Sequence, residues 1–302
     1  MKIRKLYPDR ISKVISVSLI LCFILTSCQS VETIKVPPHR LQWWLSEIVW
    51  DSERMNLTGK GIKIAILDTG VDDEHPDLHN QVQKDIKVSD LDTRSSGDKD
   101  HGTAVAGVIV GYPSNDKGIL GVAPDSKIIS IDITDDANGV VKVENIIEGI
   151  KIALEKDVNI LNISVGVKED DSRLKQAIQE AFSEGLIIIA SAGNYMDKDI
   201  LYPAKYDEVI CVGAKKKNGE ISSPKSYKEK TIIYLPGENV VTTVADNKYS
   251  SVFGTSISTA ILSGIVALML EANPQIGQKE VYKYFNDISL NDINVRRCIK
   301  LR

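Results

Sequence analysis

Apolar runs of strand length recur through the middle of this chain, with helical segments between several of them. The runs are 62–67, 128–133, 158–165, 186–191 and 209–212. Segments 143–156 and 172–184 have the apolar spacing of amphipathic helices. Strands that are apolar along their whole length and separated by helices are typical of a parallel sheet. We therefore expect an α/β fold with three layers, in which helices flank a mainly parallel central sheet.

The composition is that of a globular protein. The chain has 302 residues, of which 43% are hydrophobic and 26% are charged, and it contains no internal repeat or low-complexity tract. We expect one folded domain over residues 41–302. The formal net charge of −4 argues against a broad nucleic-acid-binding surface, so we expect no nucleic-acid partner.

The N-terminal residues have the pattern of an export signal. Five basic residues and one acidic residue precede residues 14–25, which are mostly apolar. This apolar run is shorter than the roughly 20 residues that a membrane-spanning helix needs, but it suits a signal peptide. The segment Leu25-Thr26-Ser27-Cys28 that follows resembles the bacterial lipobox, in which the peptidase cuts before a lipid-modified cysteine. An ordinary signal peptide with a chance cysteine, or an uncleaved anchor, are the alternatives.

This interpretation divides the chain into three parts: a signal peptide over 1–27, a lipid-anchored tether over 28–40 and the folded domain over 41–302. The tether is polar and contains a Pro-Pro pair. The protein would be held at the extracytoplasmic face of a bacterial cell membrane by a lipid on Cys28. Only Cys211 and Cys298 remain in the folded part, which excludes a disulfide scaffold. One bridge between them is possible, but Cys211 lies in an apolar run and is expected to pack as a small buried hydrophobe.

Two candidate catalytic residues follow from the positions of polar groups. Asp68 ends the first apolar run, so its carboxylate lies at the carboxyl edge of the sheet, where active sites of α/β proteins form. A cation site is an alternative, because further candidate ligands lie close by: Asp72, Asp73, His75 and Asp77. His101 opens a helical segment, and the helix dipole disfavours its charged form unless a carboxylate compensates. Asp68 could be that carboxylate, although a capping or core histidine is the simpler interpretation.

Two more polar segments have similar positions. Ser256 precedes the apolar segment 257–270, which is too short and too rich in hydroxyls to span a bilayer and is expected to be a buried helix. The N-terminus of a helix favours a developing negative charge, although Ser256 could simply cap the helix. Asn194 follows the run 186–191 and offers an amide donor that could hold an oxyanion; a simple turn is the alternative.

Together these segments resemble the subtilisin-like serine peptidases, the subtilases. The motifs DTGVD, HGTAVAG and GTSISTA occur in the order Asp, His, Ser that is found in subtilisin, with SAGN between the last two. The resemblance covers most of residues 41–275. It implies the three-layer subtilisin-like fold, a polypeptide substrate, Ser256 as nucleophile, His101 as general base and Asp68 as the group that orients His101. Asn194 and the Ser256 backbone N–H would stabilise the oxyanion.

The same resemblance implies a substrate-binding edge at Ser164, Val165 and Gly166, where an extended peptide would pair with the backbone. Tyr195 would shape the same pocket. Val167 stands where the family usually has a second glycine and could narrow the pocket rim. A further hypothesis is that Asp170 and Asp171 favour a basic substrate side chain.

Calcium is the only cofactor that the resemblance suggests. Asp77 matches the family's calcium-binding carboxylate, and Asn115 offers an oxygen from the loop after the histidine helix, which is one residue longer than the family's loop. We expect no catalytic cofactor and a monomeric protein. We also expect no prodomain, because only about 20 residues separate Cys28 from Trp50, and a C-terminus that is short for the family.

The sequence therefore predicts a membrane-tethered extracytoplasmic serine endopeptidase that uses a Ser-His-Asp triad. Its architecture suits limited processing, such as removal of the leader from a secreted peptide of the lantibiotic type. The alternative is a catalytically silent subtilase fold that binds peptides or acts as an immunity lipoprotein. A metal-dependent hydrolase built on Asp68, Asp72, His75 and Asp77 is a third hypothesis.

Overall fold

The computed structural model describes residues 42–48, 56–88, 99–113, 117–135, 140–194, 199–223 and 230–287. The predictions for residues 1–40, including Cys28, and those for Asn115, Tyr195 and Cys298 lie outside these ranges. The elements are α1 (Trp43–Glu47), β1 (Lys63–Asp68), β2 (Val82–Lys87), α2 (Asp100–Val110), β3 (Lys127–Asp132), α3 (Val143–Glu155), β4 (Ile160–Ile163), α4 (Ser172–Ser183), β5 (Ile187–Ser191), β6 (Ile210–Lys215), β7 (Ile232–Pro236), β8 (Val240–Val244), β9 (Lys248–Val252), α5 (Thr255–Ala272) and α6 (Gln278–Asp287).

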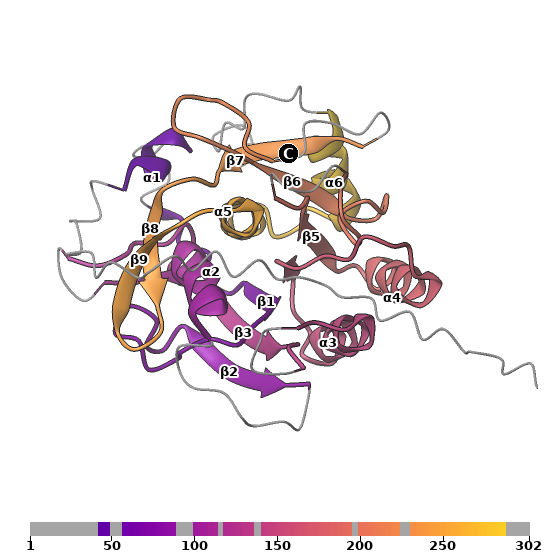
Figure 1. Ribbon diagram of the computed structural model, residues 1–302, viewed down its shortest axis with the longest axis horizontal. Helices are drawn as coiled ribbons and strands as arrows, with labels where there is room; N and C mark the ends of the chain where they lie inside the picture. Colours follow the sequence, from indigo (N-terminus) through magenta and orange to yellow (C-terminus); the bar gives the residue numbers. More distant parts are fainter. Residues whose placement is uncertain are drawn as a thin grey trace, which may run out of the picture.

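A seven-stranded sheet forms the centre of the molecule (Figure 1). Its strand order is β2-β3-β1-β4-β5-β6-β7, and every neighbouring pair is parallel. All five apolar runs of the sequence form strands of this sheet, so the predicted fold class is confirmed. The sequence pattern missed β2 and β7, which lie at the two edges.

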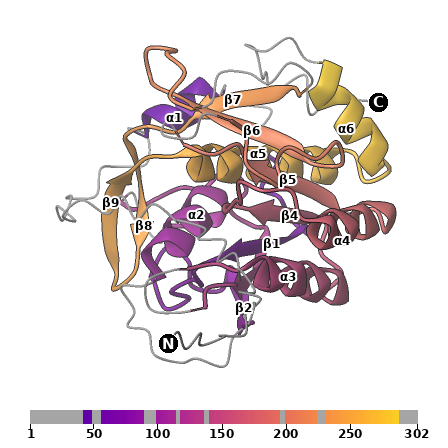
Figure 2. The same ribbon diagram turned by 45° about the vertical axis from the view of Figure 1, so that its right-hand side comes forward.

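Helices cover both faces of the sheet. One apolar cluster contains the buried residues of α2, α5 and α6, and a second contains those of α3 and α4. Figure 2 shows α3 and α4 side by side, on the other face of the sheet from α5. The amphipathic helices predicted over 143–156 and 172–184 are α3 and α4, and each turns its apolar stripe to the sheet.

Helix α5 is buried over nearly its whole length. It has 18 residues and is buried from Thr255 to Met269, so it is longer than the segment that the sequence predicted. By length and composition it could cross a membrane, but 83% of it is buried inside the domain. It is therefore the central helix of the core. Small residues allow this close packing: a Cβ atom on Gly264 would lie 2.4 Å from Cβ of Val122.

Strands β8 and β9 form an antiparallel ribbon that is separate from the main sheet. The Thr242 and Thr243 hydroxyls donate hydrogen bonds to the carbonyls of Ala104 and Thr103 in α2, at 3.0 and 2.8 Å. Gly107 of α2 permits this contact, because a Cβ atom there would lie 2.1 Å from Thr243 Oγ1. The ribbon thus joins α2 to the start of α5.

The connections of the sheet predict where a site should lie. From β1 the chain adds β2 and β3 on one side, and β4 to β7 follow on the other. The strand order therefore reverses between β1 and β4. In open α/β sheets the binding crevice forms at the carboxyl ends of the strands at such a switch point.

Candidate active site

Asp68 and His101 meet at the carboxyl end of β1. Asp68 is the last residue of the strand, and its Oδ1 atom lies 2.7 Å from His101 Nδ1. The same oxygen accepts a hydrogen bond from Thr69 N, also at 2.7 Å. The Asp68 side chain is 1% exposed, whereas that of His101 is 33% exposed. The carboxylate is therefore fixed inside the domain, and the imidazole can reach a substrate.

The position of His101 depends on a close backbone approach. His101 is the second residue of α2, and the next residue, Gly102, packs against the turn after β1. A Cβ atom on Gly102 would lie 2.1 Å from the Gly70 carbonyl oxygen, so only glycine fits. The Thr69 hydroxyl accepts a hydrogen bond from Gly102 N at 3.1 Å. This role of Thr69 was not predicted from the sequence, although the place of Thr69 in the DTG motif could have suggested it.

The pKa of His101 reflects two opposing effects. Desolvation by the surrounding protein lowers the pKa. The charge of Asp68 and its hydrogen bond to the imidazole raise the pKa, and these effects outweigh desolvation. The net result is a pKa above the usual value for histidine. The carboxylate therefore stabilises the imidazolium form, as a general base requires once it has taken a proton.

Ser256 lies at the N-terminus of α5. It is the second residue of the helix, after the N-cap Gly254 and Thr255. Its hydroxyl donates a hydrogen bond to the Ser164 carbonyl at 3.1 Å. Gly254 has a φ of 131°, in the region that favours glycine, and this conformation turns the chain from the ribbon into the helix.

The sheet brings these residues together. β1 and β4 are paired neighbours, with Leu67 opposite Ile163. His101 is hydrogen-bonded to Asp68, which follows Leu67. Ser256 is hydrogen-bonded to Ser164, which follows Ile163. Adjacent strands lie roughly 4.8 Å apart, so the histidine and the serine stand over the same pair of strand ends.

Asn194 lies beside the start of α5. Its Oδ1 atom accepts hydrogen bonds from the backbone N and the hydroxyl of Thr255, at 3.1 and 3.4 Å. These contacts fix the side-chain amide next to Ser256. The N-terminus of α5 and the Asn194 amide thus lie side by side, and together they could stabilise the negative charge of an oxyanion.

The predicted substrate edge continues β4. The Ser164 hydroxyl accepts a hydrogen bond from Asn162 Nδ2 at 3.0 Å, which fixes the Ser164 side chain. Gly166 packs against Leu201, whose Cβ atom lies 2.6 Å from the position of a Cβ at Gly166. The expectation for Val167 was wrong. Its side chain is 1% exposed and packs in the core, because its backbone pairs with Tyr202 on the adjacent segment, so it does not line a pocket rim.

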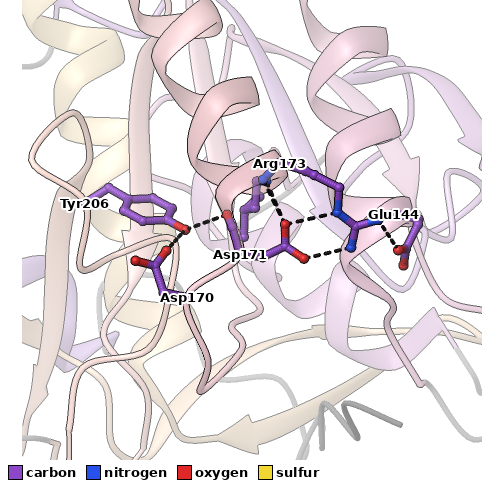
Figure 3. A network of polar contacts seen from close by, with 6 residues as sticks. Glu144, Asp170, Asp171, Arg173 and Tyr206 are labelled. Carbon is purple, nitrogen blue, oxygen red and sulfur yellow. Dashed lines mark hydrogen bonds and ion pairs between the residues drawn. The ribbon is translucent and has the colours of Figure 1, made fainter. Parts of the chain in front are cut away.

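The carboxylates of Asp170 and Asp171 are engaged within the domain (Figure 3). Asp171 caps α4 by accepting a hydrogen bond from Arg173 N at 2.8 Å, and the Arg173 guanidinium binds both of its oxygens. Hydrogen bonding by Arg173 lowers the pKa of Asp171. Asp170 accepts a hydrogen bond from the Tyr206 hydroxyl at 2.7 Å. These contacts account for both acids without a basic substrate side chain.

The acids after the DTG motif do not form a common site. Asp72 accepts hydrogen bonds from the backbone of Glu74 and Asp246. His75 is fully buried, with Nε2 3.1 Å from the Lys248 carbonyl and Nδ1 accepting from Asp77 N. Within the part of the chain that the structure describes, no group of three or more His, Cys, Asp or Glu side chains could hold a metal ion. This geometry does not support a metal-dependent hydrolase on these residues.

Asp77 is also the predicted calcium ligand. Its Oδ2 atom accepts hydrogen bonds from Ile119 N and from the Tyr249 hydroxyl, at 2.8 and 3.0 Å. Calcium takes six to eight oxygen ligands. Asp77 would supply one carboxylate to such a site, and one oxygen of that carboxylate already accepts two hydrogen bonds. Calcium binding stays a prediction, and no step of the reaction below uses it.

Cys211 is buried as expected and forms no disulfide with any described residue. Burial raises the pKa of its thiol to about 12, so the group is uncharged and unreactive at neutral pH.

Comparison with known proteins identifies the relatives of this chain. The model of the subtilase family matches residues 59–293. The major intracellular serine protease of Bacillus subtilis (strain 168) is 36% identical over 235 residues, which cover 74% of this chain and 72% of that protein. Subtilisin Savinase of Lederbergia lenta is 32% identical over 231 residues, covering 76% of this chain and 84% of that protein.

Proposed function

Because this chain belongs to the subtilase family and is a subtilisin-like serine endopeptidase, we propose that it works while tethered to the outer face of a bacterial membrane and removes leaders from secreted peptides. Its substrate class is polypeptide. The catalytic part of this proposal is supported by the hydrogen bond of 2.7 Å between Asp68 Oδ1 and His101 Nδ1, and by the position of Ser256 at the N-terminus of α5. The tethering and the choice of substrate rest on the sequence.

The first half of the reaction is acylation. Ser256 Oγ attacks the carbonyl carbon of the scissile bond as His101 Nε2 takes the hydroxyl proton. The carbonyl oxygen becomes an oxyanion that accepts hydrogen bonds from Asn194 and from Ser256 N. The C–N bond then breaks, and His101 returns the proton to the leaving amine. The remaining half of the substrate is an ester on Ser256.

Deacylation repeats these steps with water. His101 takes a proton from the water as its oxygen attacks the ester carbonyl, and then gives the proton to Ser256 Oγ as the ester bond breaks. Throughout, Asp68 holds the imidazole in the tautomer that carries hydrogen on Nδ1. The bond at 2.7 Å is the contact that enforces this tautomer.

The proposed tether depends on Cys28. A basic segment, an apolar run too short to span a bilayer and Leu-Thr-Ser-Cys at its end together favour cleavage before Cys28 and attachment of lipid to it. A peptidase held at the membrane meets peptides as they leave the cell. This placement supports limited processing, of the lantibiotic leader type, over bulk digestion.

The catalytic proposal is tested by a fluorophosphonate probe on the full chain in membranes. We expect one adduct, located on Ser256 by mass spectrometry and absent from the Ser256→Ala variant. An unlabelled but folded wild-type protein would contradict the proposed triad.

The tether is tested by cell fractionation after growth with a fatty acid that carries a clickable tag. The wild type and Cys22→Ala should be labelled and sediment with membranes, because Cys22 lies within the removed signal. Cys28→Ala should lose the label. Equal labelling of all three proteins would overturn the lipid assignment.

The substrate assignment is tested with a secreted-peptide precursor and with unfolded casein. We expect a single cut between leader and product, and slow degradation of casein. Rapid digestion of casein into many fragments would show a broad digestive protease instead.

A further inference from the structure

Phe253 is an exposed aromatic residue three positions before Ser256. Its side chain is 49% exposed, and Tyr112, at 50%, is the other large hydrophobic side chain that is exposed in the described part of the chain. A single exposed apolar residue is common on protein surfaces. Phe253 differs from most such residues because it adjoins the catalytic serine.

The backbone around Phe253 is held on both sides. Val252 pairs with Val240 at the end of the ribbon, and Gly254 N donates to the Gly237 carbonyl at 2.8 Å. Val252 packs against the core, and successive side chains of an extended strand point in opposite directions. The ring of Phe253 therefore points outward from a fixed backbone, so a ligand would not have to order the chain that carries it.

The chemistry of the reaction decides which half of the substrate lies near this ring. His101 delivers the proton to the leaving amine, so the residue after the cut lies on the side of His101 and α2. The ribbon that ends before Phe253 is hydrogen-bonded to α2 through the hydroxyls of Thr242 and Thr243. Figures 1 and 2 both place the ribbon next to α2. The edge at Ser164, which continues β4, belongs to the acyl side.

We propose that Phe253 is a specificity-determining residue that contacts the substrate residue directly after the cleaved bond and favours an apolar side chain there. This inference rests on the peptidase function proposed above. Burial of apolar area against an aromatic ring is favourable for an apolar side chain. A charged side chain at the same place would lose its hydration without gaining a hydrogen bond or a counter-charge. The acyl side of the substrate would be selected separately.

The test uses the full chain in membranes and a mixed peptide library, with each cut site mapped by mass spectrometry. For the wild type we expect leucine, phenylalanine and similar residues to dominate after the cut. For a matched peptide pair, Leu in place of Ser at this position should raise kcat/KM about tenfold, and Phe253→Ser should reduce this ratio to near one.

Tyr112→Ser is the matched control, because it removes an equally exposed aromatic ring from the loop after α2 and should leave the ratio unchanged. Phe253→Asp is a second variant and should turn the preference toward Lys and Arg. Fluorophosphonate labelling of Ser256 should stay at the wild-type rate in Tyr112→Ser and should remain detectable in both Phe253 variants, which shows that the nucleophile is still assembled.

The outcomes separate the two proposals. Labelled Ser256 together with an unchanged preference in both Phe253 variants would overturn the role of Phe253 and leave the peptidase function intact. Absence of labelling in the wild type would overturn the catalytic proposal, and the role of Phe253 with it.

Discussion

At the residue scale, a single carboxylate oxygen determines the state of the general base. Asp68 Oδ1 contacts His101 Nδ1, and both the charge and the hydrogen bond raise the pKa of the imidazole against the lowering effect of desolvation. The base must be neutral to accept the serine proton. Activity should therefore fall as the pH drops through this raised pKa.

Asp68→Asn should lower kcat roughly 10⁴-fold, because an amide can hold the imidazole in the wrong tautomer. It also removes both effects that raise the pKa of His101, while desolvation remains. The acid limb of kcat/KM should consequently move to lower pH. Measuring the pH profile of residual activity checks this, and an unmoved acid limb would show that Asp68 does not control the titration.

His75 should make the stability of the domain depend on pH. Burial lowers its pKa, and Nδ1 must be unprotonated to accept from Asp77 N. Its contribution to the free energy of unfolding is thus complete above the unfolded pKa of about 6.5 and is lost as the pH falls through the lower folded value. His75→Gln should flatten this part of the stability curve. His79 is exposed, and His79→Gln is the control, which should leave this part of the stability curve unchanged. Identical stability curves for the two variants would contradict the role assigned to His75.

At the scale of elements, α4 depends on its N-cap. Asp171 accepts hydrogen bonds from the backbone N of Arg173 and of Leu174 (Figure 3). Asp171→Ala should lower the free energy of unfolding by about 1 kcal/mol, whereas Asp171→Asn, which also caps helices, should cost little. Chemical denaturation measures both. A large loss with Asn would mean that the exposed ion pair with Arg173, and not the cap, matters most.

The contact of α2 with the ribbon links stability to the site, because the ribbon leads into α5. Gly107→Ala would place a methyl group on Thr243 and Thr242, and overpacking of this kind costs about 1–3 kcal/mol. We expect kcat to fall as well. Adding Thr243→Ala should recover part of the stability, as a double-mutant cycle would measure; no recovery would place the strain elsewhere.

At the scale of the whole molecule, the predicted calcium can be tested through the melting temperature. Two residues that follow α2 donate hydrogen bonds to Asp77: Tyr112 N to its carbonyl and Ile119 N to its Oδ2. If calcium binds there, a chelator should lower the melting temperature, and excess Ca²⁺ should restore it. An unchanged melting temperature would mean that the hydrogen bonds from Ile119 and Tyr249 suffice for Asp77.

Features that depend on the local order of residues could be predicted from the amino-acid pattern alone. Uniformly apolar runs predicted β1, β3, β4, β5 and β6. The polar residues after two of these runs, Asp68 and Asn194, and Ser256 at the start of a helical segment were predicted, together with the family motifs, to be parts of one site. These features could be predicted because the period of apolar residues and the ends of elements depend on near neighbours in the chain.

Contacts between residues far apart in the chain could be seen only in the folded domain. Ser256 is hydrogen-bonded to Ser164, 92 positions away, and Thr243 is hydrogen-bonded to Thr103, 140 positions away. Val167 faces the core because Tyr202 pairs with it, and Asp170 and Asp171 bind groups of the domain itself. The place of Phe253 beside the leaving group likewise follows from the packing of the ribbon on α2. No local pattern encodes these contacts, because each depends on which surfaces the folded elements present to one another.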